Sequence, residues 1–211
     1  TRKESSAASD VYKRQCMDSA HKHLIFVLLE DGNVVASLAQ ECWKRQSETL
    51  FPALIALMEE AHWKADDIDE VVITDGPGSY TGVRIAMTVA KVLCTRKHIP
   101  LYCISTLQLY AGMHPHTFVM LDARSSRAYT ALLDEGKFLL DEGIMTLDEV
   151  KAYLKDKDVR VVGETELIDL AHEDVDFVEN FQALRPLARR IDNVHTLTPR
   201  YLKENDAYLV K

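Results

Sequence analysis

The segment Gly76-Pro77-Gly78-Ser79-Tyr80-Thr81-Gly82 is the part of this 211-residue chain whose composition could most readily bind an anion. It follows the β-branched run Val71-Val72-Ile73 and precedes a helical pattern, so free backbone N–H groups at the helix start could receive a phosphate. The Walker pattern, however, requires Lys-Ser or Lys-Thr after its last glycine, and here Val83 and Arg84 follow. A tight turn from strand to helix explains the glycines more simply.

The helical pattern behind this glycine loop, residues 81–97, carries a stripe of small residues. Gly82, Ala86 and Ala90 fall at positions i, i+4 and i+8, and such a stripe lets a second helix approach closely. Packing within the same domain and an interface with another protein explain this stripe about equally well. The apolar side chains that could add contact beside it are Val83, Met87 and Val89 or Leu93.

Histidines and cysteines give little indication of a metal or nucleophilic site. His21 and His23 could share one face of a strand, but no carboxylate or third ligand follows at a matching spacing. His114-Pro115-His116 is typical of a turn. No Cys-x-x-Cys pair indicates a zinc knuckle, and the four thiols fit a reducing compartment: Cys16, Cys42, Cys94 and Cys103. We therefore expect no metal site.

Charge and hydropathy indicate a cytoplasmic protein that does not bind nucleic acid or membranes by itself. The net charge of −8 repels phosphate backbones. Arg185, Arg189 and Arg190 lie close together on an expected helix, where local ion pairs or a solvated face explain them better than an RNA site. The longest apolar runs, residues 24–29 and 101–104, are far shorter than the ~20 residues of a membrane span.

Hydrophobic periodicity predicts two successive α/β units. In the first, a hairpin (24–29 and 34–39) precedes a helix capped by Ser47 (47–61), a strand (70–74), the helix 81–97 and a strand (101–104), which implies a parallel crossover. The pattern then restarts, and the expected elements of the second unit are strands 118–122, 128–133 and 138–140, helix 146–155, strand 159–162 and a closing helix 182–192. We expect residues 1–15 to be a non-native leader, because they are polar and lack periodicity.

This recurrence of hairpin, crossover helix and strand is the outline of the actin-like, sugar-kinase-like (ASKHA) α/β fold, with mixed sheets flanked by helices in two related lobes. We place the first lobe at residues 16–112 and the second at residues 113–211, with the C-terminal segment packing back on the first lobe.

Four motifs carry a resemblance to a known family and together span nearly everything after residue 15. They are the loop with its helix start (Asp75 to Ile85), Gln46-Ser47-Glu48-Thr49-Leu50-Phe51-Pro52, Asp122-Ala123-Arg124 and Pro199-Arg200-Tyr201-Leu202. On these residues the chain resembles the TsaB (YeaZ) family, the non-catalytic partners in the synthesis of N6-threonylcarbamoyladenosine at position 37 of bacterial tRNA.

The resemblance implies that the two helices of the first lobe form the surface for homodimerisation in isolation and for pairing with the catalytic paralogue TsaD. TsaE, an ATPase, would dock on that pair, and tRNA would be contacted only through the complex. No cofactor is expected, and ATP or ADP would bind only in the assembled complex. The implied interface residues are Leu50, Leu54, Met58, Gly82, Val83, Ala86, Met87 and Ala90.

The resemblance also disfavours an active site of the chain's own. Where TsaD carries a metal-binding His-x-x-x-His, this chain has Thr106 and Tyr110, which are poor ligands for a divalent metal at neutral pH. Any nucleotide site would be degenerate, because no glycine follows Asp18-Ser19 to admit a phosphate; its candidate residues are Asp18, Ser19, Gly76, Gly78 and Asp122. Two alternatives stay open: a metal-dependent, glycoprotease-like peptidase, and an actin-like ATPase or kinase.

Overall fold

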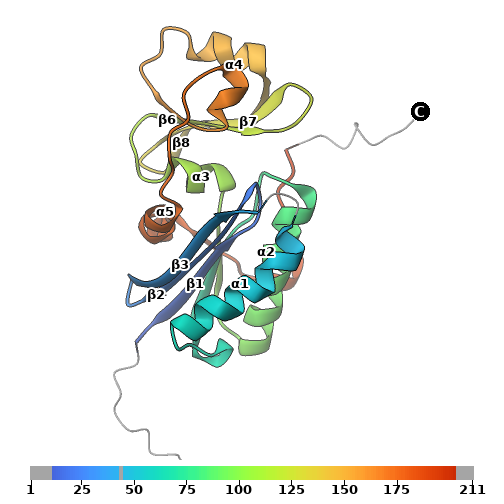
Figure 1. Cartoon of the computed structure of the whole chain (residues 1–211), viewed down its shortest axis with the longest axis vertical. Coiled ribbons are helices and arrows are strands. Elements are labelled where there is room, and N and C mark those ends of the chain that lie inside the picture. Colours follow the sequence, from blue (N-terminus) through green and yellow to red (C-terminus); the bar gives the residue numbers. More distant parts are fainter. Residues whose placement is uncertain (1–10, 43–44, 203–211) are drawn as a thin grey trace, which may run out of the picture.

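The computed structural model describes residues 11–42 and 45–202, which form two sheets and their helices in five layers (Figure 1). Helices α1 and α2 cover the outer face of the first sheet, and α4 covers the outer face of the second. Between the sheets lies a shared layer that contains α3 and α5. The arrangement is the two-lobed actin-like, sugar-kinase-like fold that the sequence predicts.

The first sheet has the strand order β10-β5-β4-β1-β2-β3. β1 and β2 pair antiparallel, as do β2 and β3, whereas β4 runs parallel to both β1 and β5, which confirms the predicted hairpin and crossover. Gly32, at φ 84°, makes the turn of the hairpin, a backbone conformation that glycine adopts readily. The strands are β1 (Lys13–Asp18), β2 (His23–Glu30), β3 (Asn33–Glu41), β4 (Glu70–Thr74), β5 (Leu101–Ile104) and β10 (Arg189–Arg190).

Helices α1 (Gln46–Glu60) and α2 (Tyr80–Lys97) match the predicted helices to within one residue at each end. Each is amphipathic and packs its apolar side on the sheet, in a core that includes Met17, Phe26, Leu50 and Ile73. The predicted cap at Ser47 is wrong, because α1 begins at Gln46 and its N-cap residue, Arg45, makes no capping bond. Gln46 is instead buried, and its Nε2 donates to the carbonyl of His21 at 2.8 Å.

The second sheet has the order β8-β7-β6-β9, which repeats the order β3-β2-β1-β4 of the first, with antiparallel and parallel pairings at the same places. α4 (Leu147–Leu154) enters between β8 and β9, as α1 does between β3 and β4. This repetition shows that the two lobes have the same strand topology. The strands are β6 (Thr117–Asp122), β7 (Arg127–Asp134), β8 (Lys137–Thr146) and β9 (Arg160–Gly163).

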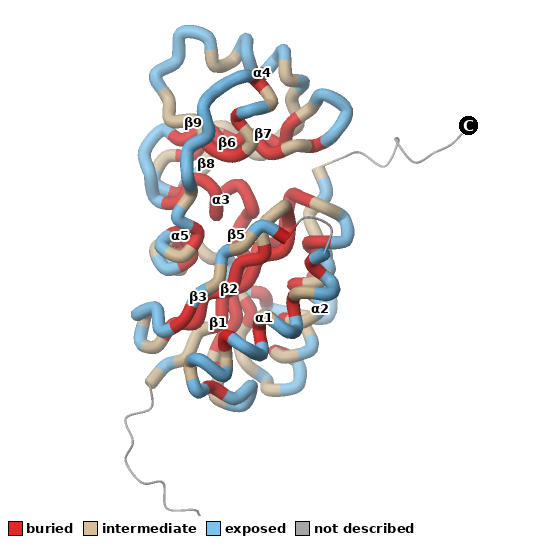
Figure 2. Tube along the Cα trace, viewed as in Figure 1, coloured by how far each residue is buried: buried red, intermediate tan, exposed pale blue. Residues whose placement is uncertain are grey.

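The middle layer joins the lobes through one continuous apolar core (Figure 2). α3 (Thr106–Ala111) and α5 (Phe177–Ala183) lie in it, and buried side chains of both sheets, such as Val27 and Val119, pack around them. Short 3-10 turns complete the chain: η1 (Ala65–Asp67), η2 (Thr165–Ile168), η3 (Arg185–Leu187) and η4 (Val194–Thr196). None of the helices in the described ranges is long and apolar enough to cross a membrane.

The elements at the two ends of the chain differ from those expected. β1 begins at Lys13, so residues 13–15 form part of the first sheet although they lack strand periodicity; residues 1–10 lie outside the described part. The closing helix 182–192 does not form, because Pro186 prevents a helix that began earlier from continuing. The chain instead continues into β10, which pairs with β5.

Candidate functional site

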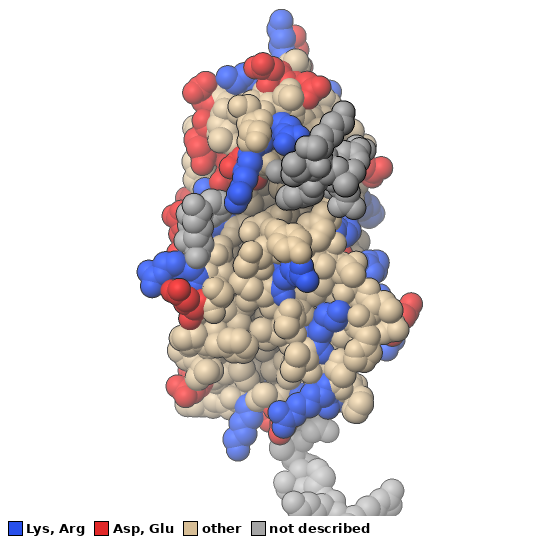
Figure 3. All heavy atoms as spheres, turned by 90° about the vertical axis from the view of Figure 1, so that its right-hand side faces the viewer, with Lys and Arg blue, Asp and Glu red and all other residues tan. Residues whose placement is uncertain are grey.

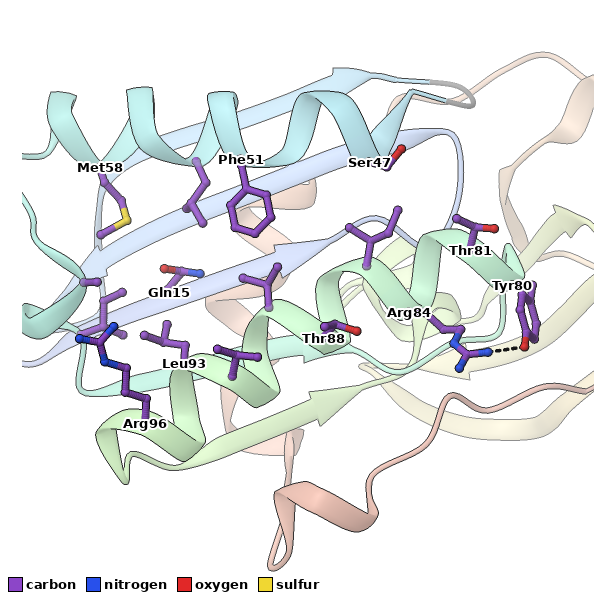
Figure 4. Close-up of a pocket in the computed structure, with 16 residues that line it drawn as sticks. Gln15, Ser47, Phe51, Met58, Tyr80, Thr81, Arg84, Thr88, Leu93 and Arg96 are labelled. Atoms are coloured by element: carbon purple, nitrogen blue, oxygen red, sulfur yellow. Dashed lines mark hydrogen bonds between the residues drawn. The ribbon is translucent and has the colours of Figure 1, made fainter.

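An apolar groove of about 820 Å³ runs between α1 and α2 on the outer face of the first lobe (Figure 4). Both helices lie on the same sheet face, and the gap between them exposes side chains that neither the sheet nor the other helix covers. Its lining residues are Gln15, Ser47, Phe51, Leu54, Met58, Ala65, Ile68, Tyr80, Thr81, Arg84, Ile85, Thr88, Val89, Val92, Leu93 and Arg96.

Large apolar side chains are exposed along this groove and beside it. Phe51 and Ile55 on α1 are 56% and 55% exposed, and Tyr80 and Val92 on α2 are 60% and 64% exposed. Contiguous apolar surface of this kind typically marks a site of protein–protein interaction. Figure 3 shows this side of the molecule, where the surface over the first lobe is mainly uncharged with scattered Lys and Arg.

The two helices beside the groove differ in charge, and the α1 residues that line it are uncharged. α2 contains Arg84, Lys91, Arg96 and Lys97 and no acidic residue, whereas α1 contains only acidic charges, Glu48, Glu59 and Glu60. Both lysines donate to backbone carbonyls of the chain itself, Lys91 to Leu197 at 2.9 Å and Lys97 to Ile68 at 2.7 Å. Arg84 and Arg96 therefore give the α2 wall of the groove its positive charge.

The small-residue stripe of α2 faces the sheet and not the groove, which corrects the predicted interface. Five of the expected contact residues are buried in the lobe core: Gly82, Val83, Ala86, Met87 and Ala90. Leu50 of α1 is buried as well, so only Leu54 and Met58 of the predicted set line the groove. A glutamate at Ala86 would therefore disrupt the core and would not report on a partner.

The outward face of α2 could have been found from the same periodicity. Ile85, Val89 and Val92 stand at i, i+4 and i+7, an apolar stripe that runs parallel to the small-residue stripe and is turned from it by roughly 100° around the helix. The sequence does not indicate Gln15 as a groove residue, because Gln15 belongs to the polar segment 1–15, which shows no periodicity. It lies on the floor of the groove, buried, and its Oε1 has no hydrogen-bond partner.

The glycine loop is filled by the protein's own backbone. A Cβ at Gly76 would lie 2.5 Å from the carbonyl oxygen of Arg200, and a Cβ at Gly78 would lie 2.3 Å from that of Ala20. Ser79 N donates to the Ala20 carbonyl at 2.7 Å, and Ser19 Oγ donates to the Gly82 carbonyl at 2.7 Å. The glycines thus serve a close backbone approach, and the loop does not fit a phosphate.

We predict that Gly82→Ala destabilises the protein by about 2 kcal/mol, although the same change in an exposed helix is stabilising. The added Cβ would lie 2.1 Å from the backbone oxygen of Ser19, which belongs to the β1–β2 connection and cannot move away freely. Gly143→Ala is the matched control, because a Cβ at Gly143 has no atom within 4 Å. Urea unfolding of both variants tests this, and an unchanged midpoint for Gly82→Ala would contradict it.

The candidate nucleotide-site residues are only partly brought together. Ser19 lies against the glycine loop and Asp18 contacts Thr74 just before it, whereas Asp122 lies at the end of β6, where its backbone N donates to Glu164 Oε2 at 2.5 Å. His21 Nε2 lies 3.4 Å from the same Glu164 oxygen, so this contact joins the two lobes. Burial lowers the pKa of His21.

Asp18 is fully buried beside this contact. Its Oδ1 accepts from Ala20 N at 3.1 Å and from the hydroxyl of Thr74, whereas Oδ2 is buried without a hydrogen-bond partner. Burial raises the pKa of Asp18 from 3.8 to about 6, and the two hydrogen bonds on Oδ1 oppose this shift. The carboxylate is therefore a source of instability at neutral pH.

We predict that Asp18→Asn stabilises the protein increasingly as the pH rises. A carboxyl whose folded pKa is raised destabilises the fold as the pH rises from the unfolded pKa to the folded pKa, here from about 4 to about 6. The asparagine does not titrate, so its stability relative to wild type should grow by roughly 2 kcal/mol between pH values of about 4.5 and 7.5. Thermal unfolding of both proteins across this range is the measurement, and a constant difference would contradict it.

The other candidates for chemistry are occupied in structural roles. Thr106 and Tyr110 are buried in α3, and within residues 11–42 and 45–202 no three His, Cys, Asp or Glu side chains could together hold a metal ion. All four cysteines are free and buried, and burial raises the pKa of Cys16, Cys94 and Cys103 to about 12. Such thiols are poor nucleophiles at neutral pH.

Two of the three C-terminal arginines form ion pairs, but their partners are distant in sequence and are not neighbours on one helix. Arg185 donates to Glu70 through Nε and Nη2, each at 2.8 Å, and Arg189 donates to Asp75 at 3.0 Å. They do not lie on one helix, because η3 and β10 separate them. Ion pairs within the chain therefore account for Arg185 and Arg189 without an RNA site.

Comparisons with known proteins agree on one family. The model of the family described as "TsaD: tRNA N6-adenosine threonylcarbamoyltransferase" matches residues 32–186. The tRNA threonylcarbamoyladenosine biosynthesis protein TsaB of Bacillus subtilis is 32% identical over 67% of this chain and 66% of its own length. TsaB of Escherichia coli is 27% identical over 66% of this chain and 61% of its own length, so each match spans less than two thirds of the relative.

A solved structure supports the fold. A Pseudomonas aeruginosa protein with similarity to peptidase YEAZ superimposes with a TM-score of 0.69, covering 91% of this chain and all of the other, at 19% identity.

Proposed function

Because this chain belongs to the TsaB (YeaZ) family, we propose that it is a non-catalytic scaffold subunit in the synthesis of N6-threonylcarbamoyladenosine at position 37 of tRNA. In this role it binds TsaD, the transferase, and supports its activity. TsaE docks on the pair, and tRNA is held by the complex and not by this chain.

The observation that carries the proposal is the apolar groove between α1 and α2. Its exposed Phe51, Tyr80 and Val92 provide the aromatic and aliphatic anchors that dominate binding energy at protein interfaces. Both helices are fixed on the sheet by a buried core, so the groove is presented as a rigid surface and little ordering is needed on binding.

The charge of the groove indicates the chemistry of its partner. Arg84 and Arg96 line the α2 wall without an acidic neighbour on that helix. A partner helix that carries apolar residues on one face and acidic residues beside them would satisfy both features. We propose that TsaD supplies such a helix.

In isolation, a second copy of this chain covers the groove. Packing the acidic α1 of one copy against the basic α2 of the other would place opposite charges together on both sides of a two-fold axis. The homodimer and the complex with TsaD would then compete for the same surface. Adding TsaD to the isolated protein should convert homodimer into heterodimer in sedimentation analysis.

Two rival functions find less support in the site. A metal-dependent, glycoprotease-like peptidase would use the positions of Thr106 and Tyr110, whose hydroxyl groups are buried in α3. An actin-like ATPase or kinase would use the glycine loop, which holds backbone atoms of Ala20 and Arg200. ATP or ADP is therefore expected to bind only in the assembled complex.

The test is direct binding between this chain and TsaD from the same genome, measured by co-elution and calorimetry. We expect a stable one-to-one complex, and no heat of ATP binding with this chain alone. Separate elution of the two proteins would overturn the proposal, and tight ATP binding by the isolated chain would favour the kinase alternative.

A further inference from the structure

The short segment Pro199–Leu202 crosses the glycine loop and touches both lobes. Along it the side chains alternate, as in an extended strand: Arg200 and Leu202 are half-buried, and Tyr201 is exposed. Leu202 packs against the core between the lobes. The side chains of Arg200 and Leu202 thus attach the segment to the protein, and the side chain of Tyr201 points toward solvent.

Arg200 is the fixed point of this segment. Its backbone N donates to the carbonyl of Asp75 at 2.8 Å, and its Nε donates to Asp75 Oδ1 at 2.9 Å. Nη2 donates to the carbonyl of Gly76 at 3.1 Å. Because Asp75 and Gly76 follow β4, these contacts attach the segment to the first lobe at the start of the glycine loop.

The same guanidinium also reaches the second lobe. Its Nη1 donates to Oε2 of Glu142 on β8 at 2.5 Å, and Oε1 of Glu142 accepts from the hydroxyl of Ser105, which caps α3. Glu142 is nearly buried, and such a charge-assisted contact is stronger than one between exposed groups. Arg200 therefore bridges carboxylates of the two lobes with one planar group.

Tyr201 connects the segment to the groove. Its ring stacks on Tyr80 with the centroids 5.2 Å apart and the planes inclined by 20°. Tyr80 lines the groove, and Arg84 lies over its ring at 4.8 Å and donates to its hydroxyl. One continuous set of contacts thus leads from Glu142 through Arg200 and Tyr201 to the end of the groove.

We infer that Pro199–Leu202 completes the partner-binding surface, and that Arg200 is a positioning residue through which the second lobe sets the end of the groove. The inference rests on the proposed function, because it assumes that a partner occupies the groove. According to this inference, Tyr201 contacts the partner beside Tyr80, and Glu142 affects partner binding although it lies outside the groove.

The test compares the affinity of TsaD for wild type, Tyr201→Ala, Glu142→Gln and Arg200→Lys by calorimetry, with a melting curve for each variant. Tyr201→Ala is expected to weaken binding about tenfold, as for an aromatic contact near an interface. Glu142→Gln and Arg200→Lys should each weaken it several-fold, since lysine cannot bond both carboxylates with one planar group. Glu173→Gln, which removes a second-lobe charge paired with Arg160, is the control and should leave binding unchanged.

The double variant Tyr201→Ala, Glu142→Gln separates positioning from general destabilisation. If Glu142 acts through Tyr201, its effect on affinity should vanish once Tyr201 is removed. Additive losses of affinity in the double variant, or wild-type affinity in both single variants, would overturn the inference. If Glu142→Gln does not fold, the double variant Arg200→Lys, Tyr201→Ala replaces it and the same criteria apply. Failure of wild type to bind TsaD would instead contradict the proposed function.

Discussion

Replacing Val92 with glutamate is expected to weaken binding of TsaD at least 100-fold while leaving the fold intact. Val92 is 64% exposed on the groove side of α2, so the new carboxylate costs little in the free protein. In the complex the same carboxylate would lose its hydration against apolar side chains, and by pairing with Arg96 one turn along α2 it would take that arginine from the acidic residues of the partner, at a cost of about 3 kcal/mol or more. Calorimetric titration of TsaD into the variant measures the loss.

The control for this variant is Leu139→Glu. Leu139 is also apolar and is 58% exposed, but it lies on β8 of the second lobe, away from the residues that line the groove. It should bind TsaD as wild type does, and both variants should melt within a few degrees of wild type. Equal affinity of Val92→Glu and wild type would place the interface elsewhere.

Replacing Glu70 with glutamine should have the largest effect on stability, a loss of about 3 kcal/mol. The carboxylate of Glu70 is almost fully buried at the start of β4 and accepts from Nε and Nη2 of Arg185, each at 2.8 Å. It also accepts from the side chain of Arg14 and, at 2.9 Å, from the hydroxyl of Tyr12. A glutamine would point its amide N–H groups at guanidinium N–H groups and leave two arginines without their counter-charge.

The pH dependence of this loss provides a second check. Burial opposes ionisation of Glu70, but its bonds to Arg185, Arg14 and Tyr12 prevail and lower its pKa from 4.5 to about 2. A lowered pKa stabilises the fold above the unfolded value, and this stabilisation disappears as the pH falls from about 4.5 to about 2. The difference between wild type and Glu70→Gln in urea unfolding should therefore be full at about pH 7 and smaller at about pH 3.

Glu48→Gln is the matched control for Glu70→Gln, because the Arg45–Glu48 pair is fully solvated, with both side chains 76% exposed. Its effect on stability should stay within about 0.5 kcal/mol. A comparable loss in both variants would show that the burial of Glu70 is not what makes its ion pairs matter.

The fold could be predicted from sequence because local signals and tertiary structure agree. The β-branched run in β4 and the apolar periodicities of α1 and α2 predict those elements to within a residue. The predictions failed where a polar or interrupted sequence is given its structure by distant contacts. Lys13 and Arg14 belong to a strand because β1 pairs with β2 and β4. Arg189 belongs to a strand because it pairs with β5.

The sequence places the expected partner surface on α1 and α2, which flank the groove, but the small-residue stripe that it favours on α2 faces the sheet. Gly82, Ala86 and Ala90 allow close approach, and the element that approaches is the lobe's own sheet and the chain around Ser19. Periodicity identifies two apolar stripes on α2 but does not say which one the sheet covers, because that depends on how the helix is rotated on it. The contacts of Arg200 join residues more than fifty positions apart, which no local pattern reveals.

The most direct test of the proposed function is formation of N6-threonylcarbamoyladenosine in tRNA by TsaD, with TsaE and ATP, in the presence and absence of this chain. We predict no modification without the chain, full modification with wild type, and a loss with Val92→Glu that higher concentrations of the variant recover. Modification by TsaD that proceeds equally well without this chain would contradict a scaffold role.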